Sequence, residues 1–184
     1  IDFTQADLTH ADLSGSELYA KGDDSLIDFT EANLANGDLS GSLLDAAALW
    51  DGSSATIDFT EANLAYADLS GSKLFGDRGE TGLIDFTEAN LVHANLSGSV
   101  LATSNWGAST INFIQADLTH ADLSGSELTA EGDDDDAAST IDFTQADLAH
   151  ADLSGSKLEA SNNAATIDFT QADLTHADLS GSEL

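Results

Sequence analysis

The histidine side chains are the residues of this chain whose type and spacing most directly suggest chemistry. All five occupy the tenth place of a repeated segment: His10, His93, His120, His150 and His176. Stacked copies of the segment would align the last four imidazoles about 5 Å apart, which suits a transition metal or a pH-sensitive cluster. Because repetition aligns equivalent residues without any need for ligation, we interpret the row as an outward corner, with metal binding as the alternative.

Two acidic runs, 21–25 and 131–136, carry oxygen ligands of the type that Ca²⁺ uses. The candidate calcium ligands are Asp23, Asp24, Asp133, Asp134, Asp135 and Asp136. Neither run has the spacing of an EF-hand loop, so we interpret both as solvated acidic turns, and an ordered Ca²⁺ ion is the alternative. No other cofactor is predicted.

Serine hydroxyls are frequent, but they do not form a predicted active site. Ser14 and Ser16 flank Gly15, and the same Ser-Gly-Ser element recurs in every copy of the repeat. An active site brings a Ser-His-Asp or a paired-carboxylate arrangement together once and in one place, whereas a residue present in every copy is structural. We therefore predict that the protein is not an enzyme and that this element forms a corner of the chain.

The repeated segment that places these residues is IDFTQADLTHADLSGSEL. It occupies residues 1–18 and returns unchanged at 167–184, with five looser copies between them. The modules are 1–18, 27–44, 57–74, 84–101, 111–128, 141–158 and 167–184, separated by insertions. Repeats of this length stack so that neighbours bury what one copy cannot, which predicts a single repeat domain over 1–184.

A shorter period of five residues lies within each module and defines the core. Phe3, Leu8, Leu13 and Leu18 are five residues apart, which fits neither a helix nor a flat strand. Large and small apolar residues alternate with polar ones over three residues, and two turn-forming residues follow. The predicted core column is Phe3, Phe29, Phe59, Phe86, Phe113, Phe143 and Phe169. We predict an all-β chain that turns a corner every five residues, with almost no helix.

The units I-D-F-T-Q, A-D-L-T-H, A-D-L-S-G and S-E-L-Y-A resemble the A-(D/N)-L-x-x pattern of the pentapeptide-repeat family, and the resemblance extends through every module. It implies a right-handed quadrilateral parallel β-helix, a solenoid of about seven coils with four pentapeptides in each. The central Phe or Leu would point inward and the Asp or Asn outward. The insertion after each coil departs from a compact member of the family.

The insertions contain mainly Ala, Ser, Gly, Asp and Asn, a composition typical of loops. All of them leave from the same corner, so we expect loops that line up along one edge of the solenoid. Their aromatic residues are Tyr19, Trp50, Phe75 and Trp106. We expect these side chains to fold back on the solenoid, and a carbohydrate or partner contact is the alternative.

The chain is strongly acidic. It contains 34 Asp and Glu residues but only four Lys and Arg residues, which gives a net charge of −30. Nucleic acids and anionic membranes require a basic patch, so neither is a predicted partner. No run of apolar residues is long enough to insert into a membrane. Stacking aligns acids at the second and twelfth places of the modules, except at Asn112 and Asn95. We interpret them as a solvated surface, or as columns that salt or calcium screens, in which case stability rises with either.

Threonine recurs at the fourth place of the modules, except at Ile114. A flat threonine array is typical of ice binding, but that function usually needs two parallel ranks. At the ninth place, only Thr119 and Thr175 accompany Thr9. Ice binding is therefore not our prediction.

Modules one and seven are identical, and neither resembles the polar cap that solenoids normally carry. We expect a window of a longer protein or a chain that pairs with copies of itself, by head-to-tail stacking or by lateral filament assembly. The predicted function is structural, as a segment of an extracellular or cell-surface filament, sheath or adhesin. The alternative comes from the resemblance, since some acidic pentapeptide-repeat proteins mimic DNA and bind DNA gyrase.

Overall fold

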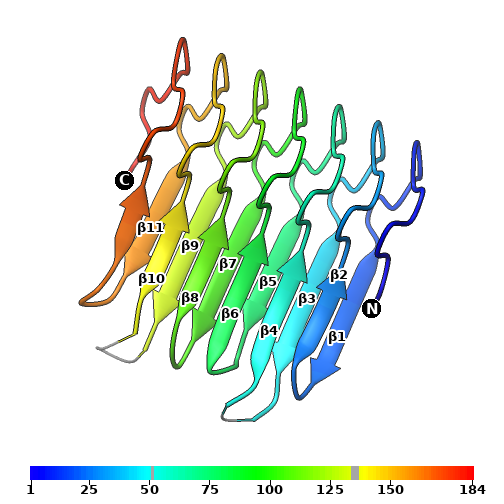
Figure 1. Cartoon of the computed structure of the whole chain (residues 1–184), viewed down its shortest axis with the longest axis vertical. Coiled ribbons are helices and arrows are strands. Elements are labelled where there is room, and N and C mark those ends of the chain that lie inside the picture. The colour runs from blue at the N-terminus through cyan, green and yellow to red at the C-terminus, as the bar shows by residue number, and fades with distance from the viewer. Residues whose placement is uncertain (51, 134–136) are drawn as a thin grey trace.

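A computed structural model describes residues 1–50, 52–133 and 137–184. Its strands form two six-stranded parallel sheets, and no helix occurs in the described residues (Figure 1). One sheet contains β1 (Glu17–Gly22), β3 (Leu43–Ala48), β5 (Lys73–Asp77), β7 (Val100–Asn105), β9 (Glu127–Gly132) and β11 (Lys157–Ser161). The other contains β2 (Ser25–Asp28), β4 (Ser54–Asp58), β6 (Thr81–Asp85), β8 (Ser109–Asn112), β10 (Ser139–Asp142) and β12 (Thr166–Asp168).

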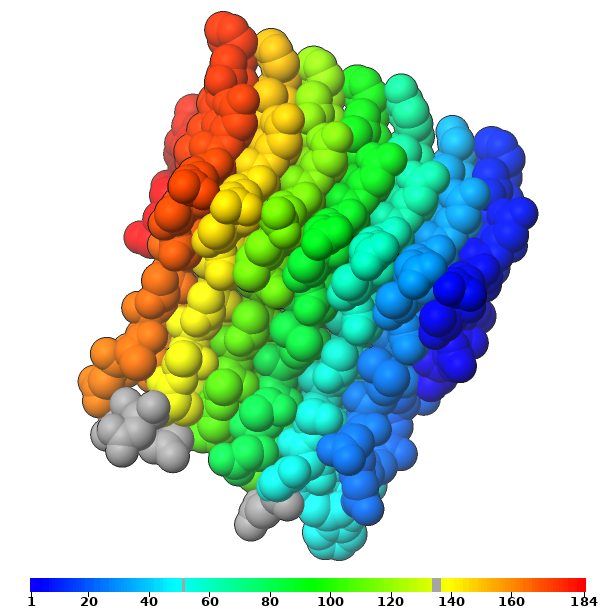
Figure 2. Space-filling view, in the orientation of Figure 1, coloured from blue at the N-terminus to red at the C-terminus, as the bar shows by residue number. Residues whose placement is uncertain are grey.

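The remaining sides of each coil pair through single parallel bridges, such as Asp7 with Asn33 and Asp12 with Asp38. The prediction of an all-β parallel solenoid is therefore confirmed, and its coils stack as parallel bands from one terminus to the other (Figure 2). Counted by paired strands, the solenoid has slightly fewer turns than the seven modules indicated. Each of the six insertions joins one strand of each sheet, so each sheet has six strands.

The corners are β-turns whose third residue adopts the left-handed conformation. In the first coil, the N–H of Ala6 donates to the carbonyl of Phe3 at 2.9 Å, and the turn residue Gln5 has φ of 57°. His10 and Gly15 take the same conformation at the next two corners, with φ of 58° and 63°. The N–H of Gln5 donates to the carbonyl of Thr30 in the following coil at 2.9 Å, and the equivalent bond forms at the corners of every coil but the last. These bonds between coils compensate the backbone strain at the corners.

The core is a ladder of phenylalanine rings with leucine, isoleucine and alanine columns around it. Consecutive rings from Phe3 to Phe169 stack with centroids 4.8–4.9 Å apart. The five interior rings are fully buried, and burial of each such side chain contributes about 1.5–3 kcal/mol. In the first coil, Phe3, Leu8, Leu13 and Leu18 are only partly buried, because no coil covers them on one side.

The insertions differ from the loops that their composition predicted. They leave from one corner, but at least half of each insertion is strand, which continues the last side of one coil outward and returns to the first side of the next (Figure 1). Small residues make this possible because they let the two sheets approach closely. The inward residues on one sheet are Ala20, Ala46, Gly76, Thr103 and Ala130. Ala20 pairs with Ala46, Ala46 with Gly76, and Thr103 with Ala130. A Cβ on Gly82 of the facing sheet would collide with the carbonyl of Gly76 and the amide of Asn105.

Candidate interaction surfaces

The outward Asp and Asn columns have a structural role that the sequence reasoning missed. In the first three pentapeptides of almost every coil, the side-chain Oδ1 accepts a hydrogen bond from the backbone N–H two residues later. Thr4 donates to Asp2 at 2.9 Å, and Ser70 donates to Asp68 at 2.9 Å. This is the Asx-turn geometry, and the recurring D-x-T and D-x-S pattern is the signal that could have revealed it. The columns therefore close the corners as well as charge the surface.

Hydrogen bonding also shifts the ionisation of carboxyls in the first and last coils. The pKa of Asp7, and likewise that of Asp173, lies below its ordinary value, chiefly because the hydroxyl of the Thr two residues later donates to the carboxylate. The pKa of Asp178 is lowered mainly by the backbone N–H of Ser180. Each of these hydrogen bonds favours the charged form of the carboxyl.

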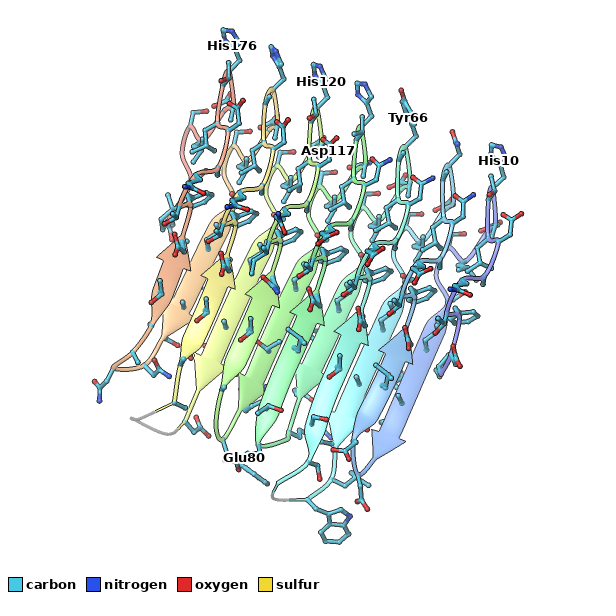
Figure 3. All side chains as sticks on the ribbon, in the orientation of Figure 1. His10, Tyr66, Glu80, Asp117, His120 and His176 are labelled. Carbon is cyan, nitrogen blue, oxygen red and sulfur yellow. The ribbon has the colours of Figure 1, made fainter. Side chains whose placement is uncertain are left out.

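The histidine row lies on an exposed corner. Tyr66, His93, His120, His150 and His176 form a continuous stack with ring centroids 4.7–4.9 Å apart (Figure 3). His10 lies on the same edge but is separated from the stack by Asn36. Within the described part of the chain, no three His, Cys, Asp or Glu side chains are grouped closely enough to hold a metal ion. The row is therefore a stack of rings on the surface. Metal binding by the histidines stays an alternative prediction, and no ligand cluster in the described residues supports it.

The predicted calcium ligands fall in two places. Asp23 and Asp24 are exposed between β1 and β2, and Oδ1 of Asp24 accepts hydrogen bonds from both the N–H and the hydroxyl of Ser54 at 3.1 Å. Asp133 is exposed just after β9, whereas Asp134, Asp135 and Asp136 lie outside the described residues. A calcium site at these positions stays a prediction.

All the cations of the chain lie on or beside one sheet, the one that begins with β1. They are Lys21, Lys73, Arg78 and Lys157. Three of the four lie close to acids: Lys21 to Asp45 at 3.8 Å, Arg78 Nε to Asp77 at 3.6 Å, and Lys157 to Glu159 at 2.5 Å. Burial raises the pKa of Asp77, and the guanidinium of Arg78 partly opposes that rise. In the described residues, this face thus carries the lysine and arginine side chains beside acids.

The insertion aromatics do not fold back on the solenoid as expected. Trp50 is 65% exposed and Trp106 is 46% exposed, and both lie at the insertion tips. Tyr19 is exposed on β1 with Lys21 over its ring, and Phe75 on β5 is partly buried. These side chains face outward because the narrow space between the two sheets admits only small residues.

A hollow with a volume of about 320 Å³ lies at the insertion tips, between Leu49, Arg78 and Trp106. Ser104 and Asp133 also line it. The tips lie at the edge of the solenoid opposite the histidine row, as the positions of Glu80 and His120 show (Figure 3). The hollow combines an aromatic face, a cation and a carboxylate in one place. Sequence reasoning could not assemble it, because its residues come from four different insertions.

The Ser-Gly-Ser elements lie at a corner in every coil, as predicted. Gly15 and its six equivalents have φ between 61° and 73°. The second serine of each element points inward in the interior coils, where Ser42 and Ser99 are buried.

No helix in the described residues is long and apolar enough to cross a membrane.

A parallel solenoid with five-residue sides, an inward phenylalanine ladder and outward Asx turns defines a repeat protein of the pentapeptide class. The family model for pentapeptide repeats matches residues 1–19, 57–76, 84–105, 111–130, 140–162 and 165–184. The chain therefore belongs to the pentapeptide-repeat family, as its five-residue units predicted. Members of this family are structural or binding proteins.

Solved structures of similar fold include the full-length plasmid-mediated fluoroquinolone resistance protein QnrB1, at 17% identity and a TM-score of 0.37, covering 98% of this chain and 80% of the other. A second is HetL from the cyanobacterium Nostoc sp. strain PCC 7120, involved in heterocyst differentiation regulation, at 25% identity and a TM-score of 0.23, covering 98% and 81%. Among curated proteins, no sequence matches this chain.

Proposed function

We propose that this protein is a non-enzymatic structural protein whose coils stack into longer solenoids, as part of an extracellular filament, sheath or adhesin. The observation that carries the proposal is the exposed core of the end coils. Phe3 in the first coil and Phe169 in the last are partly buried, whereas the five phenylalanines between them are fully buried. Another coil of the same pattern would cover such a surface, whether it belongs to the same polypeptide or to a second copy of this chain.

The pairing geometry needed for this stacking already exists inside the chain. Coils six and seven pair in register from Thr140 with Thr166 to Asp142 with Asp168. Modules one and seven have the same sequence. The first coil of a second copy would therefore stack on coil seven much as coil seven stacks on coil six. Contacts of this head-to-tail kind do not close on themselves, so they produce an open filament.

The acid columns oppose this assembly in dilute buffer. Each new joint places further Asp carboxylates one strand spacing from those of the next coil, where like charges destabilise the pair. Salt screens charges over a distance of about 10 Å at ordinary ionic strength and less at higher salt. Assembly is therefore favoured in a saline or calcium-rich setting outside the cell, which is why we place the protein there.

Light scattering and electron microscopy of the purified protein test the proposal. The particles are expected to lengthen with protein concentration and with added sodium chloride or calcium. Leu8→Glu puts a charge on the exposed core of the first coil and should stop this growth. His10→Ala changes the outward corner of the same coil and should not. Discrete short particles at every concentration and salt would refute head-to-tail stacking.

The acid columns also favour a second candidate function, in which the rod competes with DNA for DNA gyrase. Its support is the net charge of −30 and the alignment of Asp side chains along the coils. A supercoiling assay with purified gyrase decides it. Inhibition by the wild-type protein that weakens when Asp38, Asp68 and Asp122 are changed to Asn would support mimicry, and unchanged supercoiling would eliminate it.

A further inference from the structure

We propose that the hollow at the insertion tips binds a neutral sugar residue of a glycan, with Trp106 as the platform on which the sugar ring stacks. Four consecutive insertions contribute Leu49, Arg78, Trp106 and Asp133 to its wall. The indole has a broad apolar face and is 46% exposed, so it can cover the apolar face of a pyranose. Arg78 can donate hydrogen bonds and Asp133 can accept them, and sugar hydroxyls both donate and accept.

Hydrogen bonds between coils fix the backbone that carries three of the side chains lining the hollow. The N–H of Arg78 donates to the carbonyl of Ser104 at 3.1 Å, and the N–H of Trp106 donates to Gly79 at 3.1 Å. Asp133 is tied in the same way, since its N–H donates to the carbonyl of Asn105 at 2.9 Å. A site whose walls are fixed before binding loses little conformational entropy when a ligand enters.

The side chain of Asn105 supports the floor of the hollow. It is 3% exposed, its Oδ1 accepts from the N–H of Gly79 at 2.9 Å, and its Nδ2 donates to the carbonyl of Gly76 at 2.9 Å. These two bonds clamp the turn that carries Arg78 from the neighbouring coil. Asn105 is thus a positioning residue, buried between β5 and the hollow.

Arg78 is unusual in its backbone conformation. Of the described non-glycine residues with positive φ, it alone lies outside the fifth and tenth places of the modules, with φ of 71°. The left-handed conformation is unfavourable for a residue with a Cβ, and strain of this kind is concentrated at functional sites. The conformation holds the guanidinium beside the hollow, with Nε at 3.6 Å from Asp77.

The charges around the hollow decide which kind of sugar fits. The net charge of −30 repels an acidic glycan at long range. A neutral, hydroxyl-rich ring has no net charge to be repelled and uses both the donor and the acceptor of the wall. We therefore assign the hollow to neutral hexose or pentose polymers rather than to acidic polysaccharides.

The test uses the full chain with Trp50→Phe, which leaves Trp106 as the only tryptophan. Soluble β-glucan, mannan and xylan are titrated while Trp106 fluorescence is recorded, and migration through gels containing each polysaccharide is measured. At least one neutral polysaccharide should change the fluorescence and retard the protein. Alginate, as an acidic probe, should do neither at the same ionic strength.

Two variants isolate the site from the fold. Trp106→Ala should weaken binding by about tenfold or more. Arg78→Gly should weaken it as well while the melting temperature stays constant or rises, because glycine adopts the left-handed conformation without strain. Trp50→Phe is the matched control, since Trp50 is at a tip but does not line the hollow. No response to any neutral polysaccharide, or equal loss with Trp50→Phe, would overturn the proposal.

Discussion

The carboxylate of Asp7 accepts two hydrogen bonds from Thr9, one from the backbone N–H at 3.2 Å and one from the hydroxyl at 2.6 Å. The same relationship with the backbone recurs where Asn replaces Asp, as in the bond from Ala35 to Asn33 at 3.2 Å. The hydrogen bond at the corner therefore uses an acceptor oxygen and does not depend on its charge. The acidity of the surface is a separate property, which the sequence could lose without losing its turns.

Substitutions of Asp68, in an interior coil, can distinguish the role of the acceptor oxygen from that of the charge. Asp68→Ala removes the acceptor for the N–H of Ser70 and should lower the free energy of unfolding by about 1 kcal/mol. Asp68→Asn keeps an acceptor and removes a charge that faces Asp38 in the preceding coil, so stability should stay constant or rise. Urea denaturation of both variants measures the difference. Equal losses in both would mean that the charge itself stabilises the corner.

Acid should destabilise the end coils. The folded-state pKa values of Asp7, Asp12 and Asp173 lie below the ordinary value because hydrogen bonds stabilise the carboxylates. The stability from these groups is thus fully present above the unfolded-state pKa and is lost as the pH falls through the folded-state values, below about pH 4. Thermal melts followed by circular dichroism from neutral to strongly acidic pH test this. A melting temperature that rises on acidification would show that relief of repulsion is larger.

Salt should stabilise the folded chain. Asp and Asn side chains of successive coils face each other in parallel bridges, for example Asp122 with Asp152, and like charges at that spacing repel. We expect the melting temperature to rise between dilute buffer and molar sodium chloride, and to rise further with millimolar calcium if the ions bridge carboxylates. Potassium chloride at matched ionic strength is the control for calcium. An unchanged melting temperature in all of these solutions would contradict both effects.

The phenylalanine ladder should be most sensitive in its middle. Phe86 is fully buried between Phe59 and Phe113, so Phe86→Ala should cost about 3–5 kcal/mol. Phe3→Ala should cost much less, because Phe3 has a ring on one side only and is partly exposed. Denaturant titrations compare the two variants. Similar losses would indicate that the first coil is covered in solution, as stacking of copies predicts.

We expect glycine at the third corner of a coil to matter only because it readily adopts the left-handed backbone conformation. Gly98 has φ of 62°, and a Cβ built there meets no atom within 4 Å. Gly98→Ala should therefore destabilise the fold by about 1–2 kcal/mol through conformational strain without any clash. Gly82→Ala should cost more at a position of ordinary φ, because its Cβ collides with Gly76 and Asn105. A harmless Gly98→Ala would mean that the corner can relax.

Much of the fold could be predicted from the five-residue period, because Phe3, Leu8 and Leu13 at that spacing leave few ways to bury their side chains. The strands of the insertions were not predicted, because the loop-like composition of these segments was given more weight than the alternation of small or apolar residues with polar ones. In Ser109-Thr110-Ile111, small or apolar residues already alternate with polar ones before the module begins. The hollow at Trp106 was beyond prediction, since it depends on which insertions become neighbours and how far each extends.

The interior rings of the phenylalanine ladder are within 2° of parallel and keep one spacing throughout. Loss of residues 84–110 would therefore set the coil of Phe59 directly on that of Phe113 with the same contacts. A gene encoding this chain can lengthen or shorten by duplication or unequal recombination of whole repeats, and the phenylalanine ladder of the product needs no repacking. The coils differ most in their insertions, so the order of the coils matters chiefly there.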